Sequence, residues 1–484
     1  MKRIVALTAL AGMLVFTACL TSDTENPTVT IVFPGNGATV NRGDIVIKAV
    51  ATDNEDVTKV EFYINGTLTG TDNVGGAGDT FRYTWSDTTA QVAGQNYSLV
   101  AKAWDAADNN ASSAAVSITI AGGGGGTGPT HHEDDIVGGD SIWYPSGNPH
   151  IVKRKIDIRN DGKLIIMPGC VVKFDADAAL IVGNQTPGEL QAVGKPDPDS
   201  GIVFTSNATS PAPGDWLGFD FYGFTRTSTR LSYCDISYAG WENYGAVNLE
   251  WDGSIRIDNS TIRSAPKYGI WFSDAGGYIK DFTGNTITAC GSYPIYIRPE
   301  NLSKMSSGNT LTGNAKDAIY VESGSIRETG TWPSHGVPYL LGGSLSVSGD
   351  EGIYLTIGRG STVMLGTDVH VAIGQSTPGG LKADSVTFTS ASASPQRGDW
   401  EGLWFYERAT DAECRLTNCR IQYGGGDGYG LLWIDDAVPT ITGCHFAHSA
   451  SYGIYLSGTE YPDPTSLRAN NTFEDNADGD IYEP

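Results

Sequence analysis

The sequence is poor in charge, poor in basic residues, and without any compact motif for phosphate or zinc. Charged residues make up 18% of its 484 residues, and 31 Lys and Arg are outnumbered by 55 Asp and Glu, for a formal net charge of −24. Nucleic acids and anionic membrane surfaces attract basic proteins, so this balance argues against both as partners. We find no phosphate-binding loop, no nucleophile triad and no zinc-ligand spacing.

The sequence also lacks the spacing of apolar residues expected of amphipathic helices. Short segments instead alternate apolar and polar residues, and the 62 glycines and many Asn and Asp between them are typical of turns. The chain is too long for one ordinary domain. We therefore predict an all-β protein with more than one domain.

An apolar run near the N-terminus is too short to span a bilayer. It covers Ile4–Phe16 and follows the basic pair Lys2 and Arg3, which is typical of a secretion signal. We predict that residues 1–18 are a targeting segment.

The end of this segment resembles the lipobox of bacterial lipoproteins. The small residues Thr17 and Ala18 precede Cys19, although Phe16 stands where leucine is usual. The resemblance implies lipid on Cys19, a tether over residues 19–26, and anchoring at the bacterial cell envelope, on the outer membrane or cell surface. The alternative is an ordinary cleaved signal followed by an unrelated cysteine.

Residues 27–121 form the first predicted domain, an antiparallel β-sandwich. Six alternating runs are separated by Gly, Asn and Asp. The domain resembles bacterial immunoglobulin-like (Ig-like) domains through Pro34–Val40, Val60–Gly66 and Ala103–Asn109. The resemblance implies a spacer, because such domains often stand beside carbohydrate-active modules.

Four aspartates of this domain are candidate calcium ligands, namely Asp53, Asp56, Asp105 and Asp108. Carboxylates gathered at one end of a sandwich suit Ca²⁺. The alternative is that they form Asx turns. No other cofactor is indicated.

Residues 122–135 are predicted to be a linker, since the run Gly122–Gly126 has little tendency to hold a fixed structure. The adjacent His131 and His132 have no third metal ligand nearby. We therefore expect both imidazoles to be solvated.

The rest of the chain repeats with a fixed period. Ile236, Ile262, Ile287 and Leu311 follow one another at spacings of 26, 25 and 24 residues. A period of this size predicts a solenoid, and the alternation within it predicts short strands. Two residues before each aliphatic residue lies a member of a second column, which must face the same way. This ladder consists of Cys234, Ser260, Asn285 and Asn309.

These repeats resemble those of right-handed parallel β-helix (pectate-lyase-like) proteins, which implies that fold for residues 136–484. The region also contains two homologous halves, about 140–322 and 323–484. Gly214-Asp215-Trp216, for example, returns as Gly398-Asp399-Trp400. One continuous solenoid is predicted, with two separate short β-helices as the alternative.

A third column is predicted to point outward from the solenoid, and it is mostly aromatic. Aromatic rings repeating at every coil suit the stacking of sugar rings, although they are equally typical of packing on a sheet face. The predicted column is Asp220, Val247, Trp271, Tyr296, Tyr320, Tyr354, Trp404, Leu432, Tyr455 and Tyr482. Its predicted ligand-binding members are Trp271, Tyr296, Tyr320, Tyr354, Trp404 and Tyr455.

Catalytic residues are harder to identify. The resemblance implies that a lyase would need a basic residue with acidic, calcium-binding partners, and that a hydrolase would need clustered aspartates. Neither set is present. The best cluster consists of Arg256, Arg263 and Lys267 with Asp258, near Asp252. Random drift of the surface is favoured over a site as the explanation of this cluster.

Six cysteines remain besides Cys19. Several fall at ladder positions, which favours buried free thiols over disulfides, with Cys414 expected to be the most exposed. The protein is therefore interpreted as a surface-anchored monomer whose β-helix binds or displays polysaccharide without catalysis. The alternative is a polysaccharide lyase or glycoside hydrolase with a diverged site.

Overall fold

The computed structural model describes residues 23–40, 45–75, 79–86, 90–92, 95–120, 129–197, 200–274 and 276–484. Cys19 and the targeting segment lie outside these residues. The chain divides into two compact units, the second of which begins its main run at Thr119. Within the described residues, no helix has both the length and the apolar character that crossing a bilayer requires.

The first unit is built from antiparallel strands that alternate buried and exposed residues. One sheet has the order β1-β3-β6, and β4 pairs with both β5 and β7. Phe62 of β4 and Leu99 of β7 are completely buried. The predicted β-sandwich is confirmed. Its region contains β1 (Thr28–Phe33), β2 (Ala38–Val40), β3 (Ile45–Thr52), β4 (Val57–Ile64), β5 (Thr67–Asp72), β6 (Thr80–Trp85), β7 (Asn96–Asp105), β8 (Asn110–Ser112) and β9 (Val116–Ile120).

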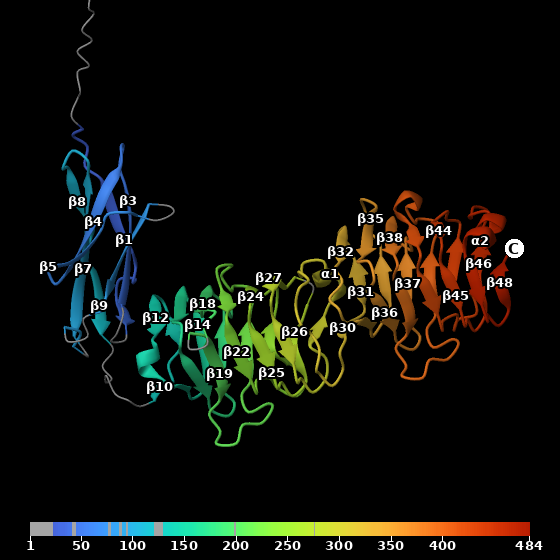
Figure 1. Ribbon diagram of the computed structural model, residues 1–484, viewed down its shortest axis with the longest axis horizontal. Helices are drawn as coiled ribbons and strands as arrows, with labels where there is room; N and C mark the ends of the chain where they lie inside the picture. The colour runs from blue at the N-terminus through green and yellow to red at the C-terminus, as the bar shows by residue number, and fades with distance from the viewer. Residues whose placement is uncertain are drawn as a thin grey trace, which may run out of the picture. The chain divides into compact units, whose positions relative to one another are not determined.

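The second unit is a parallel β-helix organised around one sheet of 14 strands, here called the long sheet (Figure 1). This sheet runs through both homologous halves, so they form one continuous solenoid. Its strands are β11 (Ile136–Val137), β14 (Lys155–Arg159), β17 (Ala179–Val182), β20 (Gly218–Phe221), β23 (Gly245–Leu249), β26 (Tyr268–Phe272), β29 (Ile295–Ile297), β30 (Ile319–Val321), β33 (Tyr339–Leu341), β36 (Thr362–Leu365), β39 (Thr387–Ser390), β42 (Arg420–Gln422), β45 (His445–Ala447) and β47 (Thr472–Glu474).

Two further sheets complete each coil of the first half. The β10 sheet contains β10 (Thr130–His132), β13 (His150–Val152), β16 (Val171–Phe174), β19 (Ile202–Ser206), β22 (Cys234–Ser237), β25 (Thr261–Arg263) and β28 (Thr286–Thr288). The β12 sheet contains β12 (Asp140–Trp143), β15 (Gly162–Ile166), β18 (Gly188–Val193), β21 (Arg230–Ser232), β24 (Ser254–Asp258) and β27 (Tyr278–Thr283).

In the second half, two other sheets accompany the long sheet. The β31 sheet contains β31 (Gly324–Ile326), β34 (Leu345–Val347), β37 (His370–Ile373), β40 (Gly402–Phe405), β43 (Leu432–Asp435), β46 (Tyr452–Ser457) and β48 (Gly479–Tyr482). The β32 sheet contains β32 (Gly330–Trp332), β35 (Ile353–Ile357), β38 (Gly379–Asp384), β41 (Arg415–Thr417) and β44 (Thr440–Thr442). Short helical turns occur at η1 (Pro145–Gly147), α1 (Pro299–Leu302), η2 (Asp411–Glu413) and α2 (Pro464–Asn470).

The two homologous halves do not use the same sheets. Strand β19 of the β10 sheet matches β39 in sequence, but β39 belongs to the long sheet. In the same way β20 of the long sheet matches β40 of the β31 sheet, and β18 matches β38. The second half is therefore turned by one sheet around the solenoid axis relative to the first.

The predicted inward ladder is confirmed. Asn285 is 1% exposed, and its Oδ1 accepts a hydrogen bond from the Ser260 backbone N–H at 3.0 Å. Its Nδ2 donates to the Ile257 carbonyl and to Asn309 Oδ1, each at 3.0 Å. Ser260 Oγ in turn accepts from the Cys234 N–H. Each ladder side chain thus satisfies a buried backbone group of the neighbouring coil.

The six cysteines within the described residues are free and buried. This confirms the expected buried thiols, but the expected exposure of Cys414 is wrong, since it is 1% exposed. Its Sγ lies 3.8 Å from the carbonyl of Gly379, inside the turn that enters β41. Burial raises the pKa of this thiol to about 12.

The expected solvation of His132 is also wrong. Residues Thr130–His132 already form β10, so the first coil begins inside the predicted linker. The His132 ring stacks on Trp143 at 3.8 Å, and its Nε2 lies 2.9 Å from Nδ1 of buried His150. Burial, followed by the charge of His150, lowers the pKa of His132 to about 3. This imidazole is a neutral packing residue.

Candidate functional site

The predicted outward column is two separate columns. Trp271, Tyr296 and Tyr320 stack in register on the long sheet. Trp404 and Tyr455 instead lie on the β31 sheet. The two tryptophans were expected on one shared face, and this expectation is wrong because the second half is turned by one sheet.

Three members of the predicted column are misplaced. Val247 and Leu432 point inward and are completely buried, and their outward neighbours Asn248 and Trp433 occupy the column. The prediction aligned each Gly-apolar pair directly, but Ile270 pairs with Val247 instead of with the residue after Gly245. Tyr354 lies on the β32 sheet, where Lys382 Nζ sits 3.8 Å from its ring centre.

The aromatic columns are packed against themselves. Tyr296 and Tyr320 stack at 4.9 Å with planes 12° apart, and Tyr455 and Tyr482 stack at 4.2 Å and 12°. The ring faces therefore point along the solenoid axis at neighbouring rings, and edges face solvent. Trp404 is likewise covered by the His370 ring at 3.8 Å. Rings in this arrangement offer little face to a sugar.

The predicted catalytic cluster does not come together. Asp258 binds Arg230 through two hydrogen bonds, at 2.8 and 2.9 Å, and also accepts from Ser232. Arg263 binds Asp235 in the same bidentate way on the β10 sheet. The side chains were expected to converge because they are close in sequence, but successive strands carry them to different sheets.

The two remaining candidates of that cluster are also separate. Arg256 pairs with Asp281 at 3.5 Å on the β12 sheet. Lys267 donates to Asn243 Oδ1 at 2.9 Å, ahead of the long sheet. Each cation of the predicted cluster thus has a partner in an adjacent coil.

The candidate calcium ligands are only partly gathered. Carboxylate oxygens of Asp53 and Asp105 lie with one of Asp23 within 4.8 Å of one another. Buried Asp105 already accepts hydrogen bonds from the Ala107 and Asn109 N–H groups. Asp56 and Asp108 are exposed and outside this group. Calcium binding by this domain stays a prediction.

A groove at the edge of the long sheet is the larger of two concave sites considered within the described residues. Its volume is about 710 Å³. It lies where the chain leaves three successive strands, β20, β23 and β26, so that their exit turns form its walls. It is lined by Asn184, Gln185, Tyr222, Gly223, Phe224, Trp251, Asp252 and Asp274. We call these residues the turn groove.

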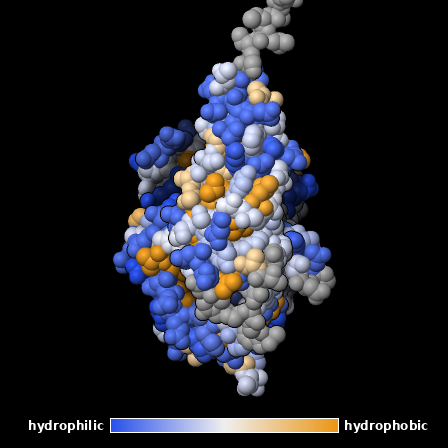
Figure 2. Space-filling view, turned by 90° about the vertical axis from the view of Figure 1, so that its left-hand side faces the viewer, coloured by the Kyte–Doolittle hydropathy of each residue, from blue (hydrophilic) through white to orange (hydrophobic). Residues whose placement is uncertain are grey.

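Two of the most exposed hydrophobic side chains in the described residues belong to the turn groove. Trp251 is 74% exposed and Phe224 is 56% exposed. Elsewhere, on the side of the molecule seen in Figure 2, hydrophobic residues form small patches between hydrophilic ones. Exposed aromatic rings beside a concavity mark binding sites more often than scattered ones do.

The turn that carries Trp251 is tightly held. Trp251 and Asp252 adopt left-handed backbone angles, with φ of 50° and 67°, which few non-glycine residues accept without cost. The Asp252 N–H donates to Asp274 Oδ1 at 3.2 Å, and the Gly253 N–H donates to the Glu250 carbonyl at 2.9 Å. These contacts hold the backbone of the turn in this conformation.

Carboxylates surround the base of the groove. Burial, then the charges of Asp220 and Asp274, raises the pKa of Glu250 to about 7. Asp220, which accepts from Asn248 Nδ2 at 2.9 Å, also has a raised pKa because it is buried. Burial raises the pKa of the neighbouring Tyr222 phenol to about 12. Asp220 belongs to the predicted column, and its charge acts on Tyr222 in the groove lining.

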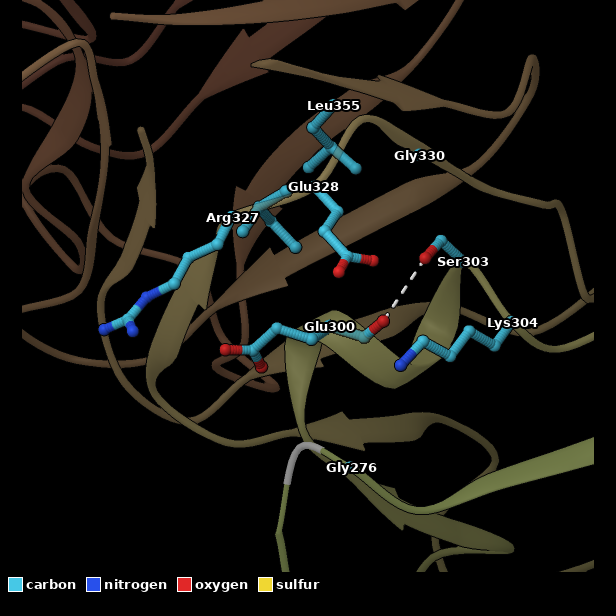
Figure 3. A pocket seen from close by; sticks show the side chains of 9 residues that line it. Gly276, Glu300, Ser303, Lys304, Arg327, Glu328, Gly330 and Leu355 are labelled. Atoms are coloured by element: carbon cyan, nitrogen blue, oxygen red, sulfur yellow. Dashed lines mark hydrogen bonds between the residues drawn. The ribbon is translucent and has the colours of Figure 1, made fainter. Parts of the chain in front are cut away.

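A second hollow, of about 340 Å³, lies between α1 and the segment of β31 and β32 that begins the second half. Figure 3 shows Glu300, Lys304 and Glu328 around it, with Arg327 extending away from Lys304. One carboxylate oxygen of Glu300 is buried without a hydrogen-bond partner. The hollow is smaller, mixed in charge and without an aromatic ring in its lining, so it is the weaker candidate.

Column periodicity could not reveal the turn groove because its key residues lie in turns. A comparison of the two halves in sequence does distinguish the residues of the groove. Phe221 aligns with Phe405 and Leu249 with Ile434, which places Arg408 at the position of Phe224 and Asp436 at that of Trp251. The exposed rings therefore belong to the first half alone.

Two family models match the chain. Residues 27–101 match the bacterial Ig domain, and residues 198–329 match the right-handed beta helix region. The chain is a bacterial Ig domain followed by a right-handed β-helix. The second match contains most of the turn groove.

Other comparisons add little. No curated protein matches the chain. Among solved structures, it is similar to one from Clostridium thermocellum, described as "Structures of Clostridium thermocellum CbhA fibronectin(III)-like modules". The identity is 25%, the TM-score is 0.17, and the match covers 20% of this chain and 47% of that one.

Proposed function

We propose that the β-helix is a non-catalytic module that binds polysaccharide in the turn groove. The combination of an Ig domain with a β-helix is that of a surface or carbohydrate-related module in general. The observation that carries the finer proposal is the pair of exposed rings, Trp251 and Phe224, on the rim of a groove lined by amide and carboxylate oxygens. Sugars present C–H faces that stack on such rings and hydroxyls that donate to such oxygens.

The dimensions of the fold suit a linear glycan. Successive coils of a parallel β-helix are about 4.8 Å apart, which is close to the length of one sugar unit. The groove spans the exit turns of three successive strands of the long sheet, and Asn184 and Gln185 follow the strand before them. Several sugar units could therefore lie along it.

We expect loss of the groove's rings to abolish binding without unfolding the protein. A glycan array screened with the soluble chain would provide the ligand. Trp251→Ala and Phe224→Ala should each weaken its binding at least about tenfold, since an apolar side chain of this size contributes roughly 1.5–3 kcal/mol when it is covered. Calorimetric titration measures this, and the melting temperature should stay nearly constant.

Trp241→Ala is the matched control. Trp241 is also 56% exposed, but it stacks on Tyr244 outside the groove, so its loss should leave affinity unchanged. Equal losses for Trp241 and Trp251, or wild-type affinity in the Trp251 variant, would exclude the groove as the binding site.

Hydrolysis is a second candidate because of Glu250. A carboxyl group with a pKa near 7 can hold a proton at neutral pH, as a general acid must. Release of reducing ends from the bound glycan, lost in Glu250→Gln while binding persists, would favour a hydrolase over a binding module.

We also propose that the protein is anchored at the bacterial cell envelope through lipid on Cys19. Support comes from the sequence Phe16-Thr17-Ala18-Cys19, which lies outside the described residues. We expect Cys19→Ala to block lipid labelling and to shift the protein from the membrane fraction to the soluble fraction, or to stop its processing. Cys19→Ala protein that remains in the membrane fraction with wild-type labelling would contradict the anchor.

A further inference from the structure

The turn groove is lined by acids and by no cation. Asp252 and Asp274 are its only charged lining residues in the described part of the chain. Glu250 precedes Trp251 directly and is half-buried among other carboxylates. Arg298 lies nearby, with its Nη2 3.5 Å from the Ser273 carbonyl, but it pairs with Glu322, which does not line the groove. The charged side chains that line the groove are therefore negative.

The acidic side chains differ in how they are engaged. Asp274 is a fixed part of the wall, because its Oδ1 accepts from the N–H groups of Gly276 and Gly277 and its Oδ2 accepts from Ser273 Oγ. Asp252 is exposed, and its carboxylate accepts no hydrogen bond within the described residues. A ligand that binds the Asp252 carboxylate therefore breaks no hydrogen bond that this carboxylate accepts within the described residues.

These observations set the charge of the ligand. An acidic sugar would bring a carboxylate beside Asp252 and Asp274 and be repelled. A neutral sugar can donate hydroxyl hydrogen bonds to these carboxylates, but it leaves their negative charge uncompensated as it displaces water, which costs desolvation. A protonated amine supplies three donors and one positive charge. We propose that the turn groove selects amine-bearing sugars, with the ammonium group against Asp252 and the ring on Trp251.

This inference rests on the proposed polysaccharide binding and narrows its ligand. The probes are three hexamers of equal length, namely glucosamine, N-acetylglucosamine and galacturonate. The glucosamine hexamer should bind at least about tenfold more tightly than its acetylated form at low salt, and the galacturonate hexamer should not bind. Added salt should reduce the preference, since it screens exposed charges.

Variants that remove one negative charge distinguish an effect of the groove on binding from an effect of the protein's overall negative charge. Asp252→Asn should weaken the glucosamine hexamer severalfold and leave the acetylated hexamer unchanged. Glu407→Gln removes the same charge in the second half, at the turn that corresponds to that of Phe224, where the Glu407 side chain is 68% exposed, and it should change nothing. Trp251→Ala should weaken both amino-sugar hexamers.

Three results would overturn the selectivity. The first is that the acetylated or the acidic hexamer binds as tightly as the glucosamine hexamer, or more tightly, and that this binding depends on Trp251. That result would contradict the preference for amines but not the proposal that the groove binds polysaccharide. The second is that Glu407→Gln and Asp252→Asn weaken binding of the glucosamine hexamer equally. The preference would then reflect the overall negative charge of the protein and not the groove. Absence of binding to all three hexamers would exclude amino sugars, whereas a glycan array without any Trp251-dependent ligand would remove the proposed function itself.

Discussion

Replacing Trp216 or Trp400 with alanine is expected to destabilise the β-helix by about 3–5 kcal/mol. These tryptophans occupy the same position in the two halves, and both are completely buried. Trp216 stacks on Phe174 at 3.8 Å and donates its Nε1–H to the Ser237 carbonyl at 2.9 Å. Trp400 makes the same bond to the Gln422 carbonyl. Alanine leaves a cavity and an unpaired carbonyl at either site.

Urea unfolding followed by circular dichroism measures these losses, and Trp→Phe at each site is the matched variant. Phenylalanine keeps most of the ring contact and loses only the hydrogen bond, so it should cost clearly less than alanine. Coils of a solenoid contact only their neighbours, so hydrogen exchange should accelerate mainly in the half that carries the change. An alanine variant with wild-type stability would show that these rings are not core residues.

Asn285→Leu is expected to cost roughly 3 kcal/mol, because it leaves two buried backbone groups unpaired at about 1–3 kcal/mol each. The Ser260 N–H loses its acceptor, and the Ile257 carbonyl loses its donor. The change also withdraws a donor from Asn309 Oδ1. Leucine adds apolar volume but cannot repair these bonds.

Asn285→Ser distinguishes hydrogen bonding from packing. Ser260 already performs the acceptor role one coil earlier, toward the Cys234 N–H, so serine should recover part of the loss despite being smaller. If serine destabilises more than leucine in urea unfolding, volume and not hydrogen bonding governs this ladder.

The ladder was predictable because it repeats. Inward positions such as Asn285 and Ile262 recur with the coil, and their environment is the coil above and the coil below. Outward-facing positions could not be predicted from the sequence with the same accuracy. Gly245 pairs with Tyr268 and not with Gly269, a difference of one residue that places Val247 inward, because neighbouring residues of a strand face opposite sides.

The turn groove could not be predicted from periodicity, because no repeated spacing marks a turn residue. Trp251 stands in a left-handed conformation that sequence rules assign to glycine or asparagine. Its setting depends on Asp274 of the next coil, which lies 23 residues further along the chain. The prediction of a catalytic cluster was wrong because closeness in sequence was taken for closeness in space. Arg256 and Arg263 are near in sequence but lie on different sheets.

The shift of the second half by one sheet has a consequence for how the two copies meet a ligand. A straight polymer lying along one edge of the solenoid meets a given turn from one copy only, because its counterpart looks out in another direction. One straight ligand therefore cannot contact both equivalent turns at once. The proposed site therefore occurs once along that edge, and the equivalent turn, where Asp436 stands at the position of Trp251, faces another direction.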